Sequence, residues 1–253
     1  MKAHLYDPTG NKTILVETPV PERERKSVAE RLMALEPSAE QLGFLNLGGE
    51  DCDMALQMAG GEFCGNATMS AAAHFARQHR LTEGWVTVKV SGADRPLRVH
   101  IRQQGTDGTY VGSVYMPLPL GIEQVELGGY SLPLVRLPGI SHLISDGILS
   151  REEAAGHIRD WCRTLGCDCL GVMLYERERE RLTPLVYVPA VDTLFWENSC
   201  ASGTAAMGAW KQHRQGGAVC GDFTEPAGIL HVEADGETLM LRGTVRQEKE
   251  IMI

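Results

Sequence analysis

Two cysteines stand at matching positions in two similar short segments, one in each half of the chain. The first segment is Cys64-Gly65-Asn66-Ala67-Thr68 and the second is Cys200-Ala201-Ser202-Gly203-Thr204. Each has a small amide or hydroxyl residue two positions after the cysteine and a threonine four positions after it. A repeated element in both halves predicts a duplicated α/β fold.

A stripe of apolar residues at helical spacing follows each cysteine. The stripes are Met69, Ala72, Ala73 and Ala76 in the first half, and Ala205, Ala206, Ala209 and Trp210 in the second. Basic residues and then glycine follow each stripe, as is typical of a helix C-terminus. Each cysteine is therefore predicted at, or just before, a helix N-terminus.

That position has chemical consequences for a thiol. The free N–H groups and the positive end of the helix dipole favour the thiolate, and they also bind anions such as a carboxylate. If both N-termini meet at one pocket, one thiolate could remove a Cα proton while the opposite thiol supplies a proton to the other face. We therefore expect Cys64 and Cys200 to act as acid and base in the inversion of a stereocentre.

The elements that position these cysteines follow from turn residues and hydrophobic patterns. Strands are predicted at 13–16, 85–90, 97–101, 110–116, 170–176, 183–188 and 229–233, and helices at 27–35 and 151–165. Pro117 and Pro119 interrupt the pattern and predict a connector. We expect an N-terminal half at 1–117, completed by a strand at about 240–253, and a C-terminal half at 118–240.

Composition excludes several functional classes. The 253 residues are 43% apolar and 23% charged, and acidic residues outnumber basic ones by 33 to 24. Such an acidic chain is a poor polyanion binder, so no nucleic-acid partner is expected. No apolar run approaches the roughly 20 residues that cross a bilayer, so no membrane partner is expected. Seven scattered cysteines and the lack of a signal peptide favour a cytoplasmic enzyme.

The segments Gly61–Thr68 and Glu197–Thr204 resemble the two cysteine motifs of the diaminopimelate epimerase-like family of amino-acid racemases and epimerases. Three other segments resemble further parts of that family: 8–11, 139–142 and 221–232. The resemblance implies two pseudo-symmetric α/β halves, each a curled, mainly antiparallel β-sheet around a central helix, with the active site in the cleft between them. It also implies a two-base racemase that needs neither pyridoxal phosphate nor a metal, and a possible homodimer.

The expected substrate is a small amino acid. Diaminopimelate epimerases carry an arginine before the second cysteine, whereas Pro189–Trp196 here has none and ends in Leu194, Phe195 and Trp196. An apolar or aromatic substrate side chain fits better, and the chain resembles most the histidine racemase-type members. Diaminopimelate epimerase, a single-cysteine isomerase of another small carboxylate and a non-catalytic carboxylate-binding module remain as alternatives.

Further candidate residues surround the two cysteines. The predicted substrate-binding set is Asn11, Gly65, Asn66, Glu197, Ala201, Ser202, Gly203, Asn46, Gln57 and His142. By resemblance, Asn11 contacts the substrate, and Asn46 occupies the place of a family glutamine that lines the site. Gln57 lies near the position of the usual asparagine before the first cysteine. The other five cysteines are interpreted as packing or ordinary thiols, and His74 is expected to point away from Cys64.

Overall fold

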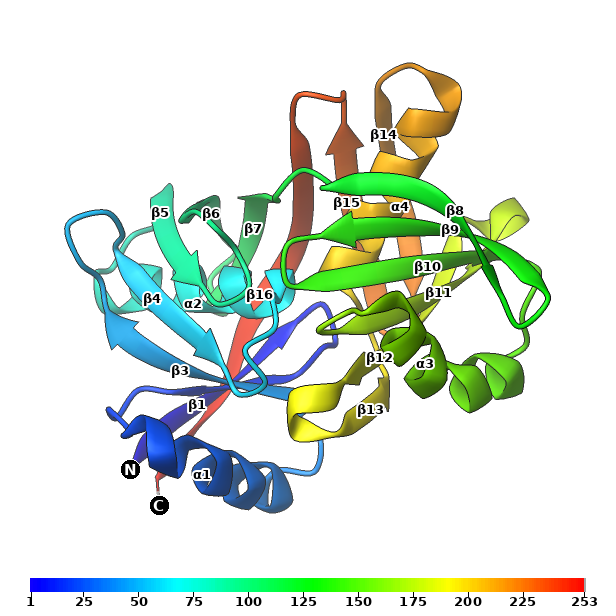
Figure 1. Ribbon diagram of the computed structural model, residues 1–253. Helices are drawn as coiled ribbons and strands as arrows, with labels where there is room; N and C mark the ends of the chain where they lie inside the picture. Colours follow the sequence, from blue (N-terminus) through cyan, green and yellow to red (C-terminus); the bar gives the residue numbers. More distant parts are fainter. Residues whose placement is uncertain (253) are drawn as a thin grey trace. The chain divides into compact units, whose positions relative to one another are not determined.

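The computed structural model describes residues 1–252, apart from the side chain of Leu47, and the chain folds as two compact units (Figure 1). Unit 1 contains Met1–Tyr115 and the C-terminal segment from Arg242 onward. Unit 2 contains Met116–Leu241. The boundary lies beside Pro117 and Pro119, whose rings fix the backbone and remove two N–H donors.

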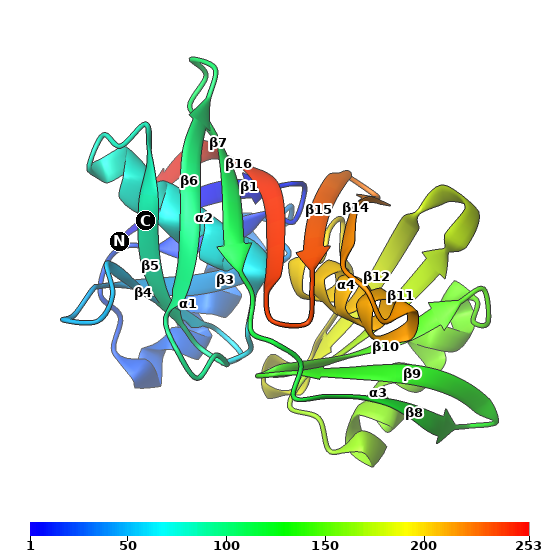
Figure 2. The same cartoon turned by 90° about the horizontal axis from the view of Figure 1, so that it is seen from above.

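Unit 1 is a closed β-barrel. Its strands, in spatial order, are β1 (Lys2–Pro8), β2 (Thr13–Val16), β3 (Gln41–Leu47), β4 (Met54–Met58), β5 (Glu83–Val90), β6 (Leu97–Gln104), β7 (Thr109–Tyr115) and β16 (Leu239–Met252). The last strand pairs antiparallel with the first, with Lys2 opposite Met252, so the two chain ends lie together (Figures 1 and 2). Closure leaves this sheet without an exposed edge.

Helix α2 (Gly65–Gln78) runs through this barrel and contacts strands all around it (Figure 2). Its sequence is dominated by small residues, and eleven of its fourteen positions are buried. Only small side chains let a helix fit inside a ring of eight strands at normal packing density. Helix α1 (Glu22–Leu35) lies outside, where Ala29 and Leu32 join an apolar cluster with residues of β1, β2 and β3.

Unit 2 repeats this arrangement around helix α4 (Ala201–Gln215). Its strands, in spatial order, are β8 (Gly121–Leu127), β9 (Tyr130–Leu137), β10 (Ile140–Asp146), β11 (Leu170–Glu176), β12 (Arg181–Val188), β14 (Val219–Glu225) and β15 (Gly228–Ala234). A short strand, β13 (Thr193–Trp196), pairs with β12. The first ten residues of α4 are all buried, whereas α3 (Arg151–Leu165) packs outside with its apolar face on β11 and β12.

The two units share one order of strand pairing. In unit 1, β2 and β3 are parallel across α1, and β4 and β5 are parallel across α2. In unit 2, β10 and β11 are parallel across α3, and β12 and β14 are parallel across α4. The other strand pairs within β1–β7 and β8–β15, and the β1–β16 pair, are antiparallel. The predicted fold class, two similar α/β halves each curled around a central helix, is confirmed.

Most predicted elements are present with small shifts at their ends. Helix α3 has the predicted bounds because a Ser150–Glu153 capping box starts it and Gly166, in the left-handed region, ends it. Helix α1 begins at Glu22, earlier than predicted, since Pro21 precedes its first turn. The charged run 176–181 is the exposed tip between β11 and β12, where it forms the short helix Arg177–Arg179.

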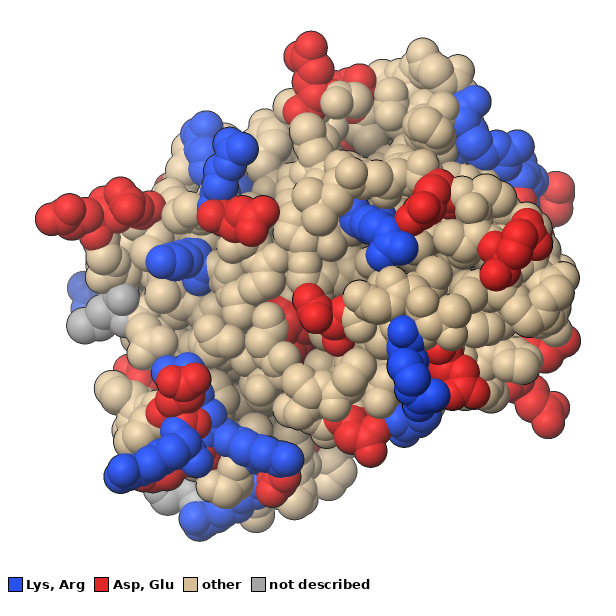
Figure 3. Space-filling model, viewed as in Figure 1, with Lys and Arg blue, Asp and Glu red and all other residues tan. Residues whose placement is uncertain are grey.

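Surface charge also agrees with the sequence. Acidic and basic side chains are interspersed on the face shown in Figure 3, including the region over α1, and no broad basic patch gathers there. Among the described residues, none of the helices is both long and apolar enough to cross a membrane.

Candidate active site

Cys64 is the N-cap residue of α2, in extended backbone with φ −137° and ψ 113°. Its Sγ accepts a hydrogen bond from the backbone N–H of Ala67 at 3.3 Å. The thiol in turn donates to Oε1 of Gln41 at 3.0 Å. The predicted placement at a helix N-terminus is therefore present, with one free N–H group of the first turn directed at sulfur.

An amide network fixes the glutamine that accepts from Cys64. Nε2 of Gln41 donates to Oγ1 of Thr13 at 2.9 Å and also to Oδ1 of Asn11. Nδ2 of Asn11 donates to Oε2 of Glu40 at 2.7 Å. Asn11 is thus joined to the Cys64 group through Gln41, and it acts on the thiol by orienting that side chain.

Sequence reasoning missed Gln41 and chose Asn46 for the equivalent role. Both lie on β3, but they are five residues apart and so on opposite faces, about 17 Å apart along the strand. Asn46 is exposed, and the structure does not bring it to Cys64. The sequence feature that could have identified Gln41 is its position as the polar residue just before an apolar run with strand-forming residues.

The other predicted residues of unit 1 lie near α2. Gly65 and Asn66 form its first turn and are buried. Gln57 lies half-buried on β4, where its Nε2 donates to the carbonyl of Met58 at 3.4 Å. Glu62, which was not predicted, lies two residues before Cys64, and burial raises the pKa of its carboxyl.

Cys200 is the N-cap residue of α4, in nearly the same backbone conformation, with φ −132° and ψ 99°. Its surroundings differ from those of Cys64. Its backbone N–H donates to Oε2 of Glu225 at 2.6 Å, and the Thr204 hydroxyl donates to Oε1 of the same carboxylate. The hydroxyl of Ser202 lies 3.6 Å from Sγ. Glu225 lies on β14, a sequence position that gave no signal of this contact.

The pKa of Cys200 is raised, contrary to the lowering expected at a helix N-terminus. Burial, followed by the negative charges of Glu197 and Glu225, raises the pKa of this thiol well above its ordinary value. These effects outweigh the predicted preference of a helix N-terminus for the thiolate. Cys200 is therefore a protonated thiol at neutral pH.

His142 lies on β10, behind the first turn of α4. Its Nε2 lies 3.0 Å from Oγ of Ser202, the residue next to the Cys200 sulfur. Burial lowers the pKa of His142 to about 3, so the imidazole is neutral. A Cβ at Gly171, directly opposite on β11, would lie 2.2 Å from His142 Nδ1. The absence of a side chain there makes room for the histidine.

The remaining predicted residues of unit 2 are close to Cys200. Ala201, Ser202 and Gly203 form the buried first turn of α4. A Cβ at Gly203 would lie 2.2 Å from Met173 Sδ and 3.2 Å from Cys200 Sγ, so any other residue there would have to displace the Met173 side chain. Glu197 follows β13 and hydrogen-bonds the Cys200 side chain.

The aromatic segment before Cys200 is divided between two faces of β13. Leu194 and Trp196 pack into the outer cluster under α3, and Arg151 stacks on the Trp196 ring at 4.1 Å. The Leu194 and Trp196 side chains are only partly buried, so the apolar surroundings expected for the substrate side chain stay a prediction. Phe195 points to the other face because side chains alternate along a strand.

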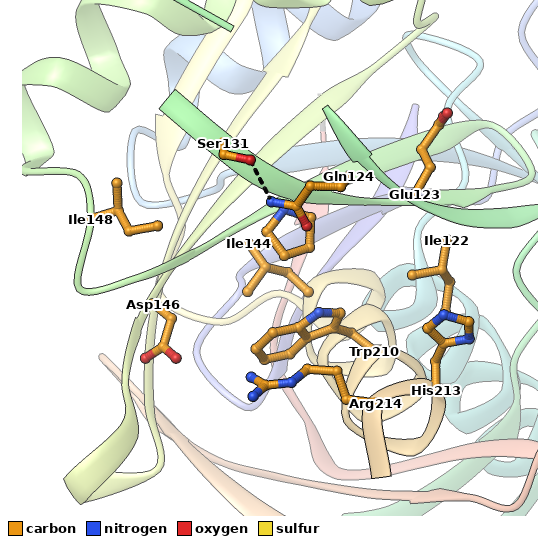
Figure 4. Close-up of a pocket in the computed structure, with 11 residues that line it drawn as sticks. Ile122, Glu123, Gln124, Ser131, Ile144, Asp146, Ile148, Trp210, His213 and Arg214 are labelled. Carbon is orange, nitrogen blue, oxygen red and sulfur yellow. Dashed lines mark hydrogen bonds between the residues drawn. The ribbon is translucent and has the colours of Figure 1, made fainter. Parts of the chain in front are cut away.

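A cavity of about 470 Å³ opens in unit 2 between β8, β9 and the last turns of α4 (Figure 4). Trp210, His213 and Arg214 line its floor. These residues lie toward the C-terminal end of α4, about 15 to 21 Å along the helix from Cys200. Neither cysteine lines this cavity, so it is separate from the chemistry described above.

Comparisons with known proteins agree with this architecture. Residues 4–248 match the family model for the N-terminal domain of the histidine racemase CntK. The chain is 32% identical to a histidine racemase of Staphylococcus aureus over 237 residues, which is 90% of this chain and 86% of that protein. It is also 32% identical to a histidine racemase of Fusobacterium nucleatum, over 80% of this chain and 78% of that protein.

Solved structures share the fold at low identity. A predicted epimerase from Pseudomonas aeruginosa superposes with a TM-score of 0.77 at 11% identity, covering 100% of this chain and 98% of that one. A probable proline racemase from Agrobacterium radiobacter gives 0.69 at 13% identity, covering 100% and 92%. The resemblance to the diaminopimelate epimerase-like racemases is confirmed: the chain belongs to the histidine racemase CntK family and is an amino-acid racemase.

Proposed function

We propose that this racemase interconverts L- and D-histidine with two thiols, Cys64 and Cys200, and without pyridoxal phosphate. One observation carries the proposal. The two cysteines cap the N-termini of the two equivalent inner helices, α2 and α4, in nearly the same backbone conformation. A duplicated fold that retains a thiol at the same position in both halves matches a reaction that needs one acid and one base.

The substrate carboxylate would bind to free N–H groups in the first turns of α2 and α4. Helix N-termini bind carboxylates because their unpaired N–H groups and dipole favour negative charge. Small residues at these turns, among them Gly65, Ala201 and Gly203, let an anion approach the backbone. Hydrogen bonds to the carboxylate also stabilise the negative charge that develops when Cα loses its proton.

Proton transfer then follows from the different surroundings of the two thiols. In the resting protein Cys200 keeps its proton because its pKa is raised, and the Cys64 thiol donates a hydrogen bond to Gln41. Loss of the Cys64 proton to solvent gives the thiolate that is the base for one enantiomer. The Cys64 thiolate takes the Cα proton and leaves an electron pair on the substrate, and the Cys200 S–H delivers its proton to the opposite face. Exchange with solvent afterwards restores the resting protonation state. The reverse direction uses the same two groups with their roles exchanged.

Histidine is supported as the substrate by the two relatives named above, which carry that activity in their names. The lack of arginine in Pro189–Trp196 also disfavours a substrate with a second carboxylate. Phe195, on the β13 face away from the outer cluster, is an aromatic residue of this segment available to contact an imidazole.

The test is proton NMR in D₂O with a panel of L-amino acids, with chiral chromatography of the products. We expect the Cα–H signal of L-histidine to disappear while the D-enantiomer forms, and that of diaminopimelate to persist. Exchange of the Cα proton in diaminopimelate or in an apolar amino acid, with none in histidine, would contradict histidine as the substrate. No exchange in any of them, with folded and reduced protein, would overturn the reaction.

Location and assembly belong to the same proposal. We place the protein in the cytoplasm, supported by its seven scattered cysteines, which suit a reducing compartment. We also expect a homodimer, on the basis of the family. Light scattering during size-exclusion chromatography measures this directly, and a mass near 27.7 kDa would contradict it.

A further inference from the structure

Three side chains that the reaction does not use meet inside unit 1. They are His4 on β1, Glu17 just after β2, and His74 on α2. One nitrogen of each histidine and one carboxylate oxygen all lie within 4.8 Å of one another. Both histidines are almost fully buried, with 4% and 3% of their surface exposed.

His74 points into this group with an unsatisfied nitrogen. Its Nε2 has no hydrogen-bond partner among the described residues, and the nearest carboxylate oxygen, Oε2 of Glu17, is 3.9 Å away. A buried polar atom without a partner carries a desolvation cost, so it calls for a ligand or another explanation. Burial also lowers the pKa of His74 to about 4, which leaves the imidazole neutral and able to donate a lone pair.

The far sides of both rings are already held by polar groups. Nδ1 of His74 lies 3.1 Å from the Tyr6 hydroxyl, and Nδ1 of His4 lies 3.1 Å from the Gln247 amide. With a cation on each Nε2, each Nδ1 would carry its proton. His74 would then donate to the Tyr6 hydroxyl, which itself donates to Oε1 of Gln247 at 3.2 Å. A turn of the Gln247 amide would offer that oxygen to Nδ1 of His4 in place of the Tyr6 hydroxyl. Such partners orient metal-binding histidines.

We propose that this group binds one Zn²⁺ through Nε2 of His4, Nε2 of His74 and one oxygen of Glu17, with water in a fourth position. Two imidazoles and a carboxylate form a common zinc donor set. Metal–ligand bonds of about 2.0–2.1 Å at tetrahedral angles place ligand atoms about 3.3 Å apart. The present separations from Glu17 Oε2, 2.6 Å to His4 and 3.9 Å to His74, lie on either side of that value.

Glu17 provides both the access route and the charge adjustment. Its side chain is 31% exposed, so an ion can reach the group from solvent. Glu17 now pairs with Lys2 at 3.1 Å, and Lys2 also lies 3.9 Å from Glu250. When zinc takes the Glu17 oxygen, the Lys2 ammonium keeps a carboxylate partner by moving toward Glu250.

The bound ion would join β1, the end of β2 and the inner helix α2. His74 is ten residues from Cys64, about 15 Å along the helix. The site would therefore hold α2 in the barrel and take no part in the proton transfers. The test of zinc binding does not depend on the proposed reaction.

The experiment is metal titration of protein stripped with a chelator and kept reduced, in a Cys64→Ser/Cys200→Ser background that removes those two thiols as competing ligands. We expect one Zn²⁺ per chain by elemental analysis after desalting, and X-ray absorption showing two imidazoles with only N or O donors. At about 100 times the dissociation constant, zinc should raise Tm by about 5 to 10 °C.

His74→Gln and Glu17→Gln should each abolish this binding and the Tm shift. Glu17 is partly exposed, so Glu17→Gln keeps the test valid if the buried substitution unfolds the barrel. His231→Gln is the matched control, because Cys220, His231 and Glu233 form a second, exposed cluster of possible ligands. Retained binding in Glu17→Gln, loss in His231→Gln, a sulfur donor in the absorption spectrum, or no bound zinc would each overturn the proposal.

Discussion

The Cys64 and Cys200 environments share a backbone position and differ in chemistry. Cys64 contacts the neutral amide of Gln41, which Asn11 and Thr13 hold in place. Cys200 is fully buried beside two carboxylates, those of Glu197 and Glu225. A duplicated fold thus supplies two thiols at equivalent positions, while residues contributed by other strands give each thiol a different electrostatic environment.

Removal of either thiol should have the largest effect on activity. Cys64→Ser and Cys200→Ser should each lower kcat for racemisation by about 10²- to 10⁴-fold, the range for loss of a general acid or base. Circular dichroism of D-histidine formation gives the rate. Cys52→Ser and Cys220→Ser, which replace one thiol in each unit away from the helix caps, should retain activity. A large loss in only one of the two catalytic variants would support a single-cysteine isomerase.

The second test makes Cys64 resemble Cys200. Gln41→Glu places a carboxylate beside the Cys64 sulfur, and the added negative charge makes the thiolate harder to form. We expect kcat/KM at pH 7 to fall by about 10- to 100-fold and its pH profile to move to higher pH. Gln104→Glu, at the exposed end of β6 and outside the predicted substrate-binding set, is the control and should leave the profile in place. An unshifted pH profile in Gln41→Glu would show that Gln41 does not influence the proton affinity of Cys64.

Two buried histidines whose pKa is lowered, His74 in unit 1 and His142 in unit 2, predict acid sensitivity. The pKa of His74 is lowered to about 4 and that of His142 to about 3, from the ordinary 6.5. Below pH 6.5 the unfolded chain binds protons that the folded chain does not, so stability falls as pH falls. From pH 6.5 to 5 the loss is about 2 kcal/mol for each histidine.

Urea unfolding at several pH values, with chelator present, measures this effect. His142→Gln should remove about half of the pH dependence, and His74→Gln should remove the other half. A wild-type protein equally stable at pH 6.5 and 5 would contradict neutral burial of both rings.

The smallest effect concerns the third position after each cysteine, which is Ala67 in unit 1 and Gly203 in unit 2. Gly203→Ala brings Cβ to 2.2 Å from Met173 Sδ, so it should destabilise by about 1 to 3 kcal/mol through overpacking. Gly156→Ala is the control within α3, where a Cβ meets nothing within 4 Å, and it should stabilise by up to about 1 kcal/mol. Thermal unfolding distinguishes them. Equal Tm shifts would show that Met173 moves aside freely.

The sequence predicted what depends on local patterns. Alanine-rich stripes gave both inner helices and hence the position of both cysteines, because helix periodicity and termination signals are local. The strand expected at about 240–253 is present as β16, whereas β1 and β3 were not predicted, because their pairing partners are distant in the sequence. The choice of Asn46 over Gln41 had the same origin, since only the register of β3 shows which polar side chain meets Cys64. Glu225 approaches Cys200 through sheet pairing, which no local pattern encodes.

In the proposed reaction, two thiols act on opposite faces of Cα. The most direct measurement is the early fate of deuterium when L-histidine reacts in D₂O, followed by mass spectrometry of the separated enantiomers. At a few per cent conversion, the account predicts D-histidine that carries deuterium at Cα and remaining L-histidine that carries protium. Protium at Cα of the product, or deuterium entering the remaining L-histidine as fast as product forms, would contradict two bases and indicate one.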